Sequence, residues 1–259
     1  MTISAPQTFE PDGRSIPFVD EGEGHLLVLL PGQGLSIASL GTLAHVLEEE
    51  GFRILRIGVR AQPADTASVT LHDLGQDVVD VLDHLGIGQA WIGGHGFGST
   101  LARVIARDHA DRVEGLVLLG VEGSGPVSAE ASAALDSAFA AATANEAGDA
   151  IRVLAGDAVD AGFAWNVFSR LRDDDARALQ AAARAATPAE EWEPLADRIP
   201  VNIIQGTHDR IDLPETAEKL RATAPTRASL ASIDGGGYLA VITHPGEIGA
   251  EIEDYLGWD

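Results

Sequence analysis

The chain has 259 residues, no cysteine and a formal net charge of −23, from 40 acidic and 17 basic side chains. The lack of cysteine excludes disulfides, cysteine nucleophiles and thiolate metal sites, and so acidic a chain disfavours nucleic acid and anionic membranes as partners. No apolar run is long enough to span a bilayer and the first residues lack the pattern of a signal peptide, so we expect a cytoplasmic protein.

Strand and helix patterns alternate along the first half of the chain. A turn signal at residues 11–14 predicts a hairpin over residues 8–20, and the apolar run at 25–30 is typical of a strand covered on both faces. Further strands are expected at 52–59, 89–92 and 115–120, and helices at 36–50, 71–85 and 101–106. This alternation predicts a parallel sheet with helices on both faces.

Residues 122–198 break this rhythm, because they contain no convincing strand pattern. They are rich in alanine, and their periodicity predicts helices at 128–145, 149–155, 162–171 and 173–186, with one more opening at 187–190. Strands and helices alternate again from residue 201. We therefore expect an α/β core formed by residues 1–121 and 199–259. Residues 122–198 would form a helical cap over the carboxyl ends of the strands, where ligands bind in such sheets.

The stretch Gly-Gly-His-Gly-Phe-Gly-Ser-Thr at residues 93–100 lies between a predicted strand and a predicted helix. This order is typical of a nucleophile elbow, a sharp turn of the form G-x-S-x-G that exposes a reactive serine. The middle position here is Gly96, which has no side chain. We expect Gly96 to keep the turn with a positive φ, which glycine adopts easily. Ser99 follows on the first turn of the helix, where we expect its hydroxyl to cap or pack the helix.

The order of several landmarks resembles that of the α/β-hydrolase fold family over almost the whole chain. Residues 29–34 (Leu-Leu-Pro-Gly-Gln-Gly) resemble its oxyanion loop, and residues 204–209 and 234–238 resemble the segments that carry its acid and its histidine. His244-Pro245 follows Tyr238 at the spacing at which the family often has His-Pro after the catalytic histidine. The resemblance implies a mostly parallel central sheet of about eight strands, helices on both faces and an inserted helical cap.

The same resemblance implies a site in which two members of a catalytic triad are replaced. Gly96 stands where the family has its serine, and Tyr238 stands where it has its histidine. Of the triad only the acid, Asp209, remains. The backbone N–H groups of Gln33 and Phe97 match the family's oxyanion-stabilising donors, which a side-chain substitution need not remove. The predicted site therefore combines backbone donors, a carboxylate and a phenol.

Other residues are candidates for the same site. Glu122 follows the strand after the elbow, where it could pair with Asp209 so that one carboxyl becomes a general base; it could equally be a solvated side chain at the mouth of the cap. Trp165 and Trp192 either line a pocket for an apolar carbonyl compound or pack the cap against the sheet. The histidines lack metal-ligand spacing, so we expect neither a metal nor a cofactor.

Four functions remain open from the sequence. The first is an enzyme that acts on, or binds, a small apolar carbonyl compound without an acyl-enzyme. The second is a catalytically degenerate protein that binds a ligand or has a structural role, and the third is a hydrolase that activates water through Asp209 or Glu122. The least favoured is a serine hydrolase with an unusual nucleophile. Each non-structural alternative implies a small-molecule partner, and none specifies the ligand or the oligomeric state.

Overall fold

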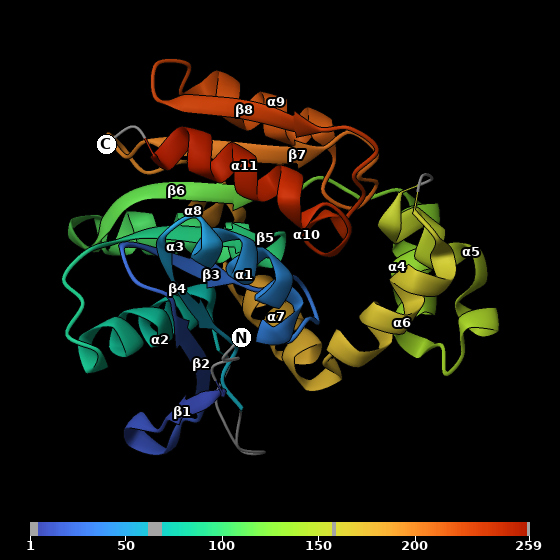
Figure 1. Ribbon diagram of the computed structural model, residues 1–259, viewed down its shortest axis with the longest axis horizontal. Coiled ribbons are helices and arrows are strands. Elements are labelled where there is room, and N and C mark those ends of the chain that lie inside the picture. The colour runs from blue at the N-terminus through green and yellow to red at the C-terminus, as the bar shows by residue number, and fades with distance from the viewer. Residues whose placement is uncertain (1–4, 62–68, 157–158, 258–259) are drawn as a thin grey trace.

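A computed structural model describes residues 5–61, 69–156 and 159–257. Its centre is an eight-stranded sheet in the order β1-β2-β4-β3-β5-β6-β7-β8 (Figure 1). The strands are β1 (Gln7–Phe9), β2 (Ile16–Glu21), β3 (His25–Leu30), β4 (Phe52–Ile57), β5 (Ala90–His95), β6 (Val113–Leu119), β7 (Val201–Gly206) and β8 (Ala228–Ile233). The pairs β1–β2 and β2–β4 are antiparallel and all others are parallel. The predicted α/β class with a mostly parallel sheet is confirmed.

Helices cover both faces of the sheet, as the apolar strand patterns predict. In β3, Val28 and Leu30 pack toward α2 (Leu71–His84), α3 (Phe97–Asp108) and α9 (Pro214–Thr223). Leu27 and Leu29 pack toward α1 (Gly41–Glu49) and α11 (Pro245–Leu256) on the opposite face. Side chains alternate between faces along a strand, so a continuous apolar run is buried on both sides. Each such side chain stabilises the fold by about 1.5–3 kcal/mol.

Five helices of the described chain lie between β6 and β7. They are α4 (Ala129–Ala140), α5 (Ala144–Ala155), α6 (Ala161–Leu171), α7 (Asp174–Ala186) and α8 (Ala189–Trp192). Figure 1 shows α4, α5 and α6 grouped beyond one end of the strands, whereas α7 and α8 return to the sheet. The expected single helix over 128–145 is wrong. Ala141 is extended, and the Thr143 side chain caps α5 by accepting the N–H of Glu146. The division into core and cap stays a prediction.

The carboxyl ends of β5, β6 and β7 lie side by side and bring three loops together. His95 pairs with Leu119, and Leu119 pairs with Ile204. The chain continues in register beyond these pairs, because the N–H of Gly96 donates to Leu119 and the N–H of Gly120 donates to Ile204, each at 2.9 Å. The loops after these strands therefore start next to one another. A short helix, α10 (Ala240–Thr243), follows the loop after β8 and precedes α11.

Candidate functional site

The turn between β5 and α3 has the geometry expected of an elbow. Gly96 has φ 51° and ψ −108°, so the positive φ predicted from the sequence is confirmed. The strand and the helix approach closely here, since a Cβ atom on Gly94 would lie 2.1 Å from the carbonyl carbon of Gly98. The Ser99 hydroxyl donates to the Gly96 carbonyl oxygen at 2.7 Å and is fully buried. Ser99 therefore caps the turn, as the sequence predicts.

The space beside Gly96 is occupied by the side chains of two distant residues. A Cβ atom on Gly96 would lie 2.8 Å from Oδ2 of Asp212 and 3.2 Å from Cε2 of Tyr238. A Cβ atom on Gly120, which also has a positive φ, would lie 3.0 Å from the same Asp212 oxygen. A Cβ atom on Gly96 would force the Asp212 carboxyl to shift, and one on Gly120 would crowd it. Gly96 and Gly120 together form a seat for the carboxyl of Asp212.

Asp209 lies next to this seat but does not line the neighbouring cavity. Its Oδ1 accepts the backbone N–H groups of Ile211 and Asp212, each at 2.9 Å. The Gln205 side chain donates to the backbone carbonyl of Asp212 at 2.7 Å. These bonds form a tight turn after β7 that fixes the position of Asp212. Sequence reasoning missed Asp212, whose only local signal is a second acidic residue three positions after Asp209.

Tyr238 reaches the site from the loop after β8. It is 2% exposed, and its ring centre lies 4.6 Å from that of His95. Nε2 of His95 donates to the backbone carbonyl of Tyr238 at 2.7 Å, which ties the two loops together. Burial lowers the pKa of His95 to about 4, so its ring is neutral at neutral pH. The hydroxyl proton of Tyr238 has no acceptor in the described part of the chain.

The loop that carries Gln33 is held in place by α7 and the turn before it. The N–H of Gly34 donates to the buried side chain of Gln180 at 2.7 Å, and its carbonyl accepts the N–H of Asp173 at 2.7 Å. Gln33 and Phe97 both line the cavity, as predicted. The N–H of Phe97, at the start of α3, has no acceptor among the described residues, whereas that of Gln33 faces the oxygen of Tyr238. Their role as oxyanion donors stays a prediction.

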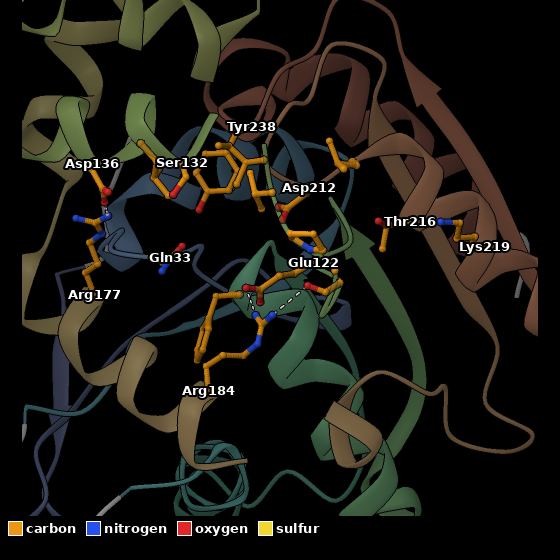
Figure 2. A pocket seen from close by; sticks show the side chains of 18 residues that line it. Gln33, Glu122, Ser132, Asp136, Arg177, Arg184, Asp212, Thr216, Lys219 and Tyr238 are labelled. Atoms are coloured by element: carbon orange, nitrogen blue, oxygen red, sulfur yellow. Dashed lines mark hydrogen bonds and ion pairs between the residues drawn. The ribbon is translucent and has the colours of Figure 1, made fainter. Parts of the chain in front are cut away.

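A cavity of about 460 Å³ opens above these groups. Figure 2 shows Asp212 and Tyr238 together at one end of it, with Lys219 and the ion pair of Arg177 with Asp136 on opposite sides. Its lining is mixed, with many charged and polar groups. The described lining residues are Gln33, Phe97, Glu122, Gly123, Gly125, Pro126, Val127, Ser132, Leu135, Asp136, Arg177, Arg184, Ile211, Asp212, Leu213, Thr216, Lys219 and Tyr238.

Glu122 lines the cavity, but the structure corrects its expected pairing with Asp209. Its carboxylate forms an ion pair with Arg184 and accepts the Thr100 hydroxyl at 2.9 Å. The ion pair and the hydrogen bond hold the Glu122 carboxylate on Arg184 and Thr100, and no contact joins it to Asp209 in the described chain. Glu122 therefore anchors Arg184, as Figure 2 shows.

The two tryptophans do not line the cavity, which corrects the expectation of an aromatic lining. Trp192 is buried with its ring between two guanidinium groups, 5.5 Å from that of Arg103 and 4.0 Å from that of Arg184. Trp165 packs against Phe168 and stacks with Arg172 at 5.5 Å. Trp192 thus joins α8 to α3 and α7, whereas the contacts of Trp165 lie within α6 and the residue that ends it.

Burial controls the protonation of the two groups beside Gly96. It raises the pKa of Asp212 well above its ordinary value, and the charge of Asp209 raises it further, against the opposing effect of Arg184 and Arg103. Burial also raises the pKa of Asp209, but two backbone N–H groups stabilise its charged form, so Asp209 is the more acidic of the pair. Burial and both carboxyls raise the pKa of Tyr238. Burial therefore favours the protonated forms of both the Asp212 carboxyl and the Tyr238 phenol.

Two kinds of feature are absent from the described residues. None of their helices is both long and apolar enough to cross a membrane. They also contain no group of three His, Cys, Asp or Glu side chains that could hold a metal ion.

The fold agrees with a comparison to known families. The model of the alpha/beta hydrolase fold family matches residues 25–245. The chain therefore belongs to the α/β-hydrolase family.

Its relatives carry different names. It is 26% identical to a Mycobacterium phage D29 protein named "Putative non-heme haloperoxidase", over 86% of this chain and 85% of that one. It is 34% identical to a proline iminopeptidase of Neisseria meningitidis serogroup B, over 43% of this chain and 34% of that one. Among solved structures, an esterase from Thermogutta terrifontis has a TM-score of 0.76 at 20% identity, covering 98% of both chains. A meta-cleavage product hydrolase from Pseudomonas fluorescens IP01 has a TM-score of 0.79 at 18% identity, and the match covers 97% of both chains. At such identities these two structures establish the fold alone.

Proposed function

We propose that the protein acts on a small carbonyl compound without forming an acyl-enzyme, and that Gly96 and Tyr238 stand at the family's nucleophile and histidine positions. The crowding at Gly96 supports this most directly, because a Cβ atom there would lie 2.8 Å from the carboxyl of Asp212. Nucleophilic catalysis needs a side chain at the elbow with a base in hydrogen-bonding reach. Here a carboxyl and a phenol fill that space.

The groups around the cavity suit a reaction in which a proton moves at the carbon beside a carbonyl. In such a reaction the C–H bond breaks, its electron pair forms the enolate double bond, and the negative charge collects on the carbonyl oxygen. Donors at Gln33 and Phe97 would stabilise that charge. The ionised carboxyl of Asp212 would accept the proton from carbon and, once protonated, would donate a hydrogen bond to the enolate oxygen, as the hydroxyl of Tyr238 would. This is the chemistry of isomerases and lyases, which require no covalent intermediate of the acyl type.

The cavity also limits the substrate. A volume of about 460 Å³ admits a small molecule. Charged and polar side chains, among them Arg177 and Lys219, contribute to its lining. We therefore propose a carbonyl compound that carries further polar groups, in place of the apolar compound expected from the sequence. The names of the relatives, which include an iminopeptidase and an epoxide hydrolase, are consistent with a small-molecule substrate.

A second candidate, a ligand-binding protein without catalysis, is favoured by one observation. Oδ2 of Asp212 and the hydroxyl of Tyr238 are buried side-chain oxygens of residues that line the cavity, an arrangement that suits binding of a polar ligand atom without any reaction. The third candidate, activation of water by Asp209 or Glu122, is less well supported. Asp209 is engaged by backbone N–H groups away from the cavity lining, and Glu122 is neutralised by Arg184.

The proposal is tested by looking for a covalent intermediate. We expect the protein to give no burst of nitrophenol with p-nitrophenyl acetate and to gain no mass after incubation with a fluorophosphonate, as measured on the intact protein. Gly96 offers no nucleophile, and the buried Ser99 hydroxyl is committed to the Gly96 carbonyl. Stoichiometric labelling of one serine, or a stoichiometric burst, would contradict the proposal.

A further inference from the structure

We propose that the inner end of the cavity is a binding site for an organic oxyanion, an enolate or a phenolate, whose oxygen accepts hydrogen bonds from the side chains of Asp212 and Tyr238. This inference deepens the proposed function and rests on it, because it identifies the species that the site stabilises. It differs from the family-type oxyanion site, in which the donors are the backbone N–H groups of Gln33 and Phe97.

The two side-chain oxygens face the same side of the elbow. A single point, the Cβ position of Gly96, lies 2.8 Å from Oδ2 of Asp212 and 3.6 Å from the hydroxyl oxygen of Tyr238. Each residue is 2% exposed. Within residues 5–61, 69–156 and 159–257, Oδ2 of Asp212 has no hydrogen-bond partner, and the Tyr238 hydroxyl has no acceptor for its proton, while the N–H of Gln33 faces its oxygen. An unpartnered buried polar group is costly and rare. Two that converge beside a cavity indicate a site that a ligand atom completes.

Both groups are proton donors in this environment. A carboxylic acid held neutral by burial donates one hydrogen bond, and so does a phenol. Burial raises the pKa of both groups and so favours the protonated forms that donate. The charged and titratable groups that act on Asp212 are Asp209, Arg103 and Arg184; those that act on Tyr238 are Asp209, Asp212 and Arg177, and the neutral His95 ring packs against it. An anionic oxygen accepts bonds from such donors more strongly than a neutral one does.

The surrounding charge favours an anion at this end of the cavity. Arg103 is 1% exposed and forms no ion pair with any described residue. Its guanidinium donates only to uncharged oxygens: the carbonyls of Ser99, Glu193 and Glu122 and the hydroxyl of Thr100. Its charge acts on Asp212, as that of Arg184 does. A buried cation without a carboxylate partner stabilises negative charge nearby.

The turn after β7 positions the first donor. Asp209 holds the N–H groups of Ile211 and Asp212, and Gln205 holds the carbonyl of Asp212. The seat formed by Gly96 and Gly120 accepts the carboxyl from the other side. Asp209 is therefore a positioning residue for Asp212.

The test uses p-nitrophenol, whose ionised form absorbs visible light, as the probe. We expect the wild-type protein to lower the apparent pKa of bound p-nitrophenol, because the site binds the anion more tightly than the neutral phenol. This measurement needs no variant. A raised apparent pKa on binding, or no binding at millimolar probe, would overturn the proposal.

Variants then assign the donors. Tyr238→Phe and Asp212→Ala should each weaken nitrophenolate binding tenfold or more, whereas Asp212→Asn keeps a neutral donor and should stay within a few-fold of wild type. Tyr255→Phe, at the second of the chain's 2 tyrosines, and Asp83→Asn, at an exposed carboxylate paired with Arg112, are the matched controls and should bind as wild type does. If Asp212→Asn and Asp212→Ala both bind nitrophenolate tenfold more tightly, Asp212 is an anion that repels the probe and the assignment is wrong.

Failure of this inference is distinguishable from failure of the proposed function. If the protein exchanges the α-protons of ketones but shows no preference for nitrophenolate, the oxyanion assignment to Asp212 and Tyr238 is wrong and the proposed function stands. If nitrophenolate binds through both residues but no ketone exchanges, the oxyanion site stands and the protein is a binding protein.

Discussion

Gly96 shapes the site because it has no side chain and leaves space for its neighbours. Its backbone keeps the strained turn between β5 and α3, and the absence of a Cβ atom admits the carboxyl of Asp212 and the ring of Tyr238. In the proposed function, the loss of the nucleophile and the entry of the carboxyl are therefore one structural change. Restoring a serine at position 96 would displace Asp212 before it could restore any chemistry.

The crowding predicts a stability cost for the smallest side chain. Gly96→Ala should lower the free energy of unfolding by about 2–6 kcal/mol, of which about 1–3 kcal/mol is backbone strain and about 1–3 kcal/mol is overpacking. Urea denaturation measures it. Gly86→Ala is the control, since Gly86 also has a positive φ but nothing lies within 4 Å of its Cβ position. Its free energy of unfolding should fall only by the part that comes from backbone strain. Equal losses in both variants would show that Asp212 does not fill the space.

The raised pKa of Asp212 predicts a pH-dependent gain in stability for Asp212→Asn. A carboxyl whose folded pKa is raised binds its proton more tightly in the folded than in the unfolded state, so its contribution to stability falls as the pH rises above 3.8. The neutral amide does not undergo this loss. The variant should therefore have a higher Tm than wild type at about pH 8, and the gap should close toward about pH 3. A lower Tm for the variant at the higher pH would mean that the carboxylate is stabilised in its charged form.

Residue-scale prediction from the sequence succeeded where the signal is local. The positive φ of Gly96 and the capping role of Ser99 follow from one short stretch that joins a strand to a helix. The position of Asp212 could not be predicted from one short stretch. Its seat is formed by glycines that follow two different strands, and its orientation comes from a turn made by Asp209. The corrected role of Glu122 has the same origin, since its partner, Arg184, lies on a helix far along the chain.

At the scale of elements, α3, α7 and α8 form one unit beneath the cavity. The ring of Trp192 at the end of α8 lies between Arg103 of α3 and Arg184 of α7. This packing holds the guanidinium groups whose charges act on Asp212. The alanine-rich sequence predicted most of the helices here, but not the break between α4 and α5. Thr143 begins the second helix as a local cap within an otherwise continuous helical pattern.

His72 links α2, α3 and α8, and we expect its contacts to contribute to the stability of the fold in a pH-dependent way. Nδ1 of His72 contacts Asp108 at 2.5 Å and Nε2 contacts Glu191 at 2.8 Å, and hydrogen bonding to Asp108 raises its pKa above 6.5. A raised histidine pKa gives stability that is fully present below 6.5 and is lost as the pH rises through the folded value. His72→Gln should therefore lower the Tm at about pH 5.5 and should have less effect at about pH 9.

The matched control for His72 is His45, whose contacts at 3.6–3.7 Å involve carboxylates of its own helix only. His45→Gln should change the Tm little at either pH, as expected for an exposed pair within one helix. A pH-independent effect of His72→Gln would contradict a role for the charged ring in joining the three helices.

At the scale of the whole molecule, the fold class was predictable because its signal is repeated along the chain. Alternating strand and helix patterns, with landmarks in family order, led to the mostly parallel eight-stranded sheet. The contents of the cavity were less predictable, because they depend on which side chains from separate loops reach the same space. Trp165 and Trp192 illustrate this: their large apolar rings fitted a pocket as well as a helix interface, and only the packing distinguishes them.

The net charge of −23 predicts a dependence of stability on salt. Like charges on so acidic a chain repel one another in the compact state, and added salt screens this repulsion. The Tm should therefore rise with sodium chloride up to about 1 M, and equally with potassium chloride, as measured by differential scanning calorimetry. A fall in the Tm with salt would mean that attractive ion pairs outweigh the net repulsion.

The most direct test of the proposed function is exchange of the α-protons of small ketones in D₂O, followed by proton NMR. With acetone, cyclohexanone and acetophenone as a panel, we predict that the wild-type protein accelerates exchange of at least one ketone and that Tyr238→Phe slows it at least tenfold. Tyr255→Phe should exchange at the wild-type rate, and none of these proteins should gain mass. Absence of any acceleration by the wild type, or full activity in Tyr238→Phe, would contradict the account of a site that stabilises an enolate without a covalent intermediate.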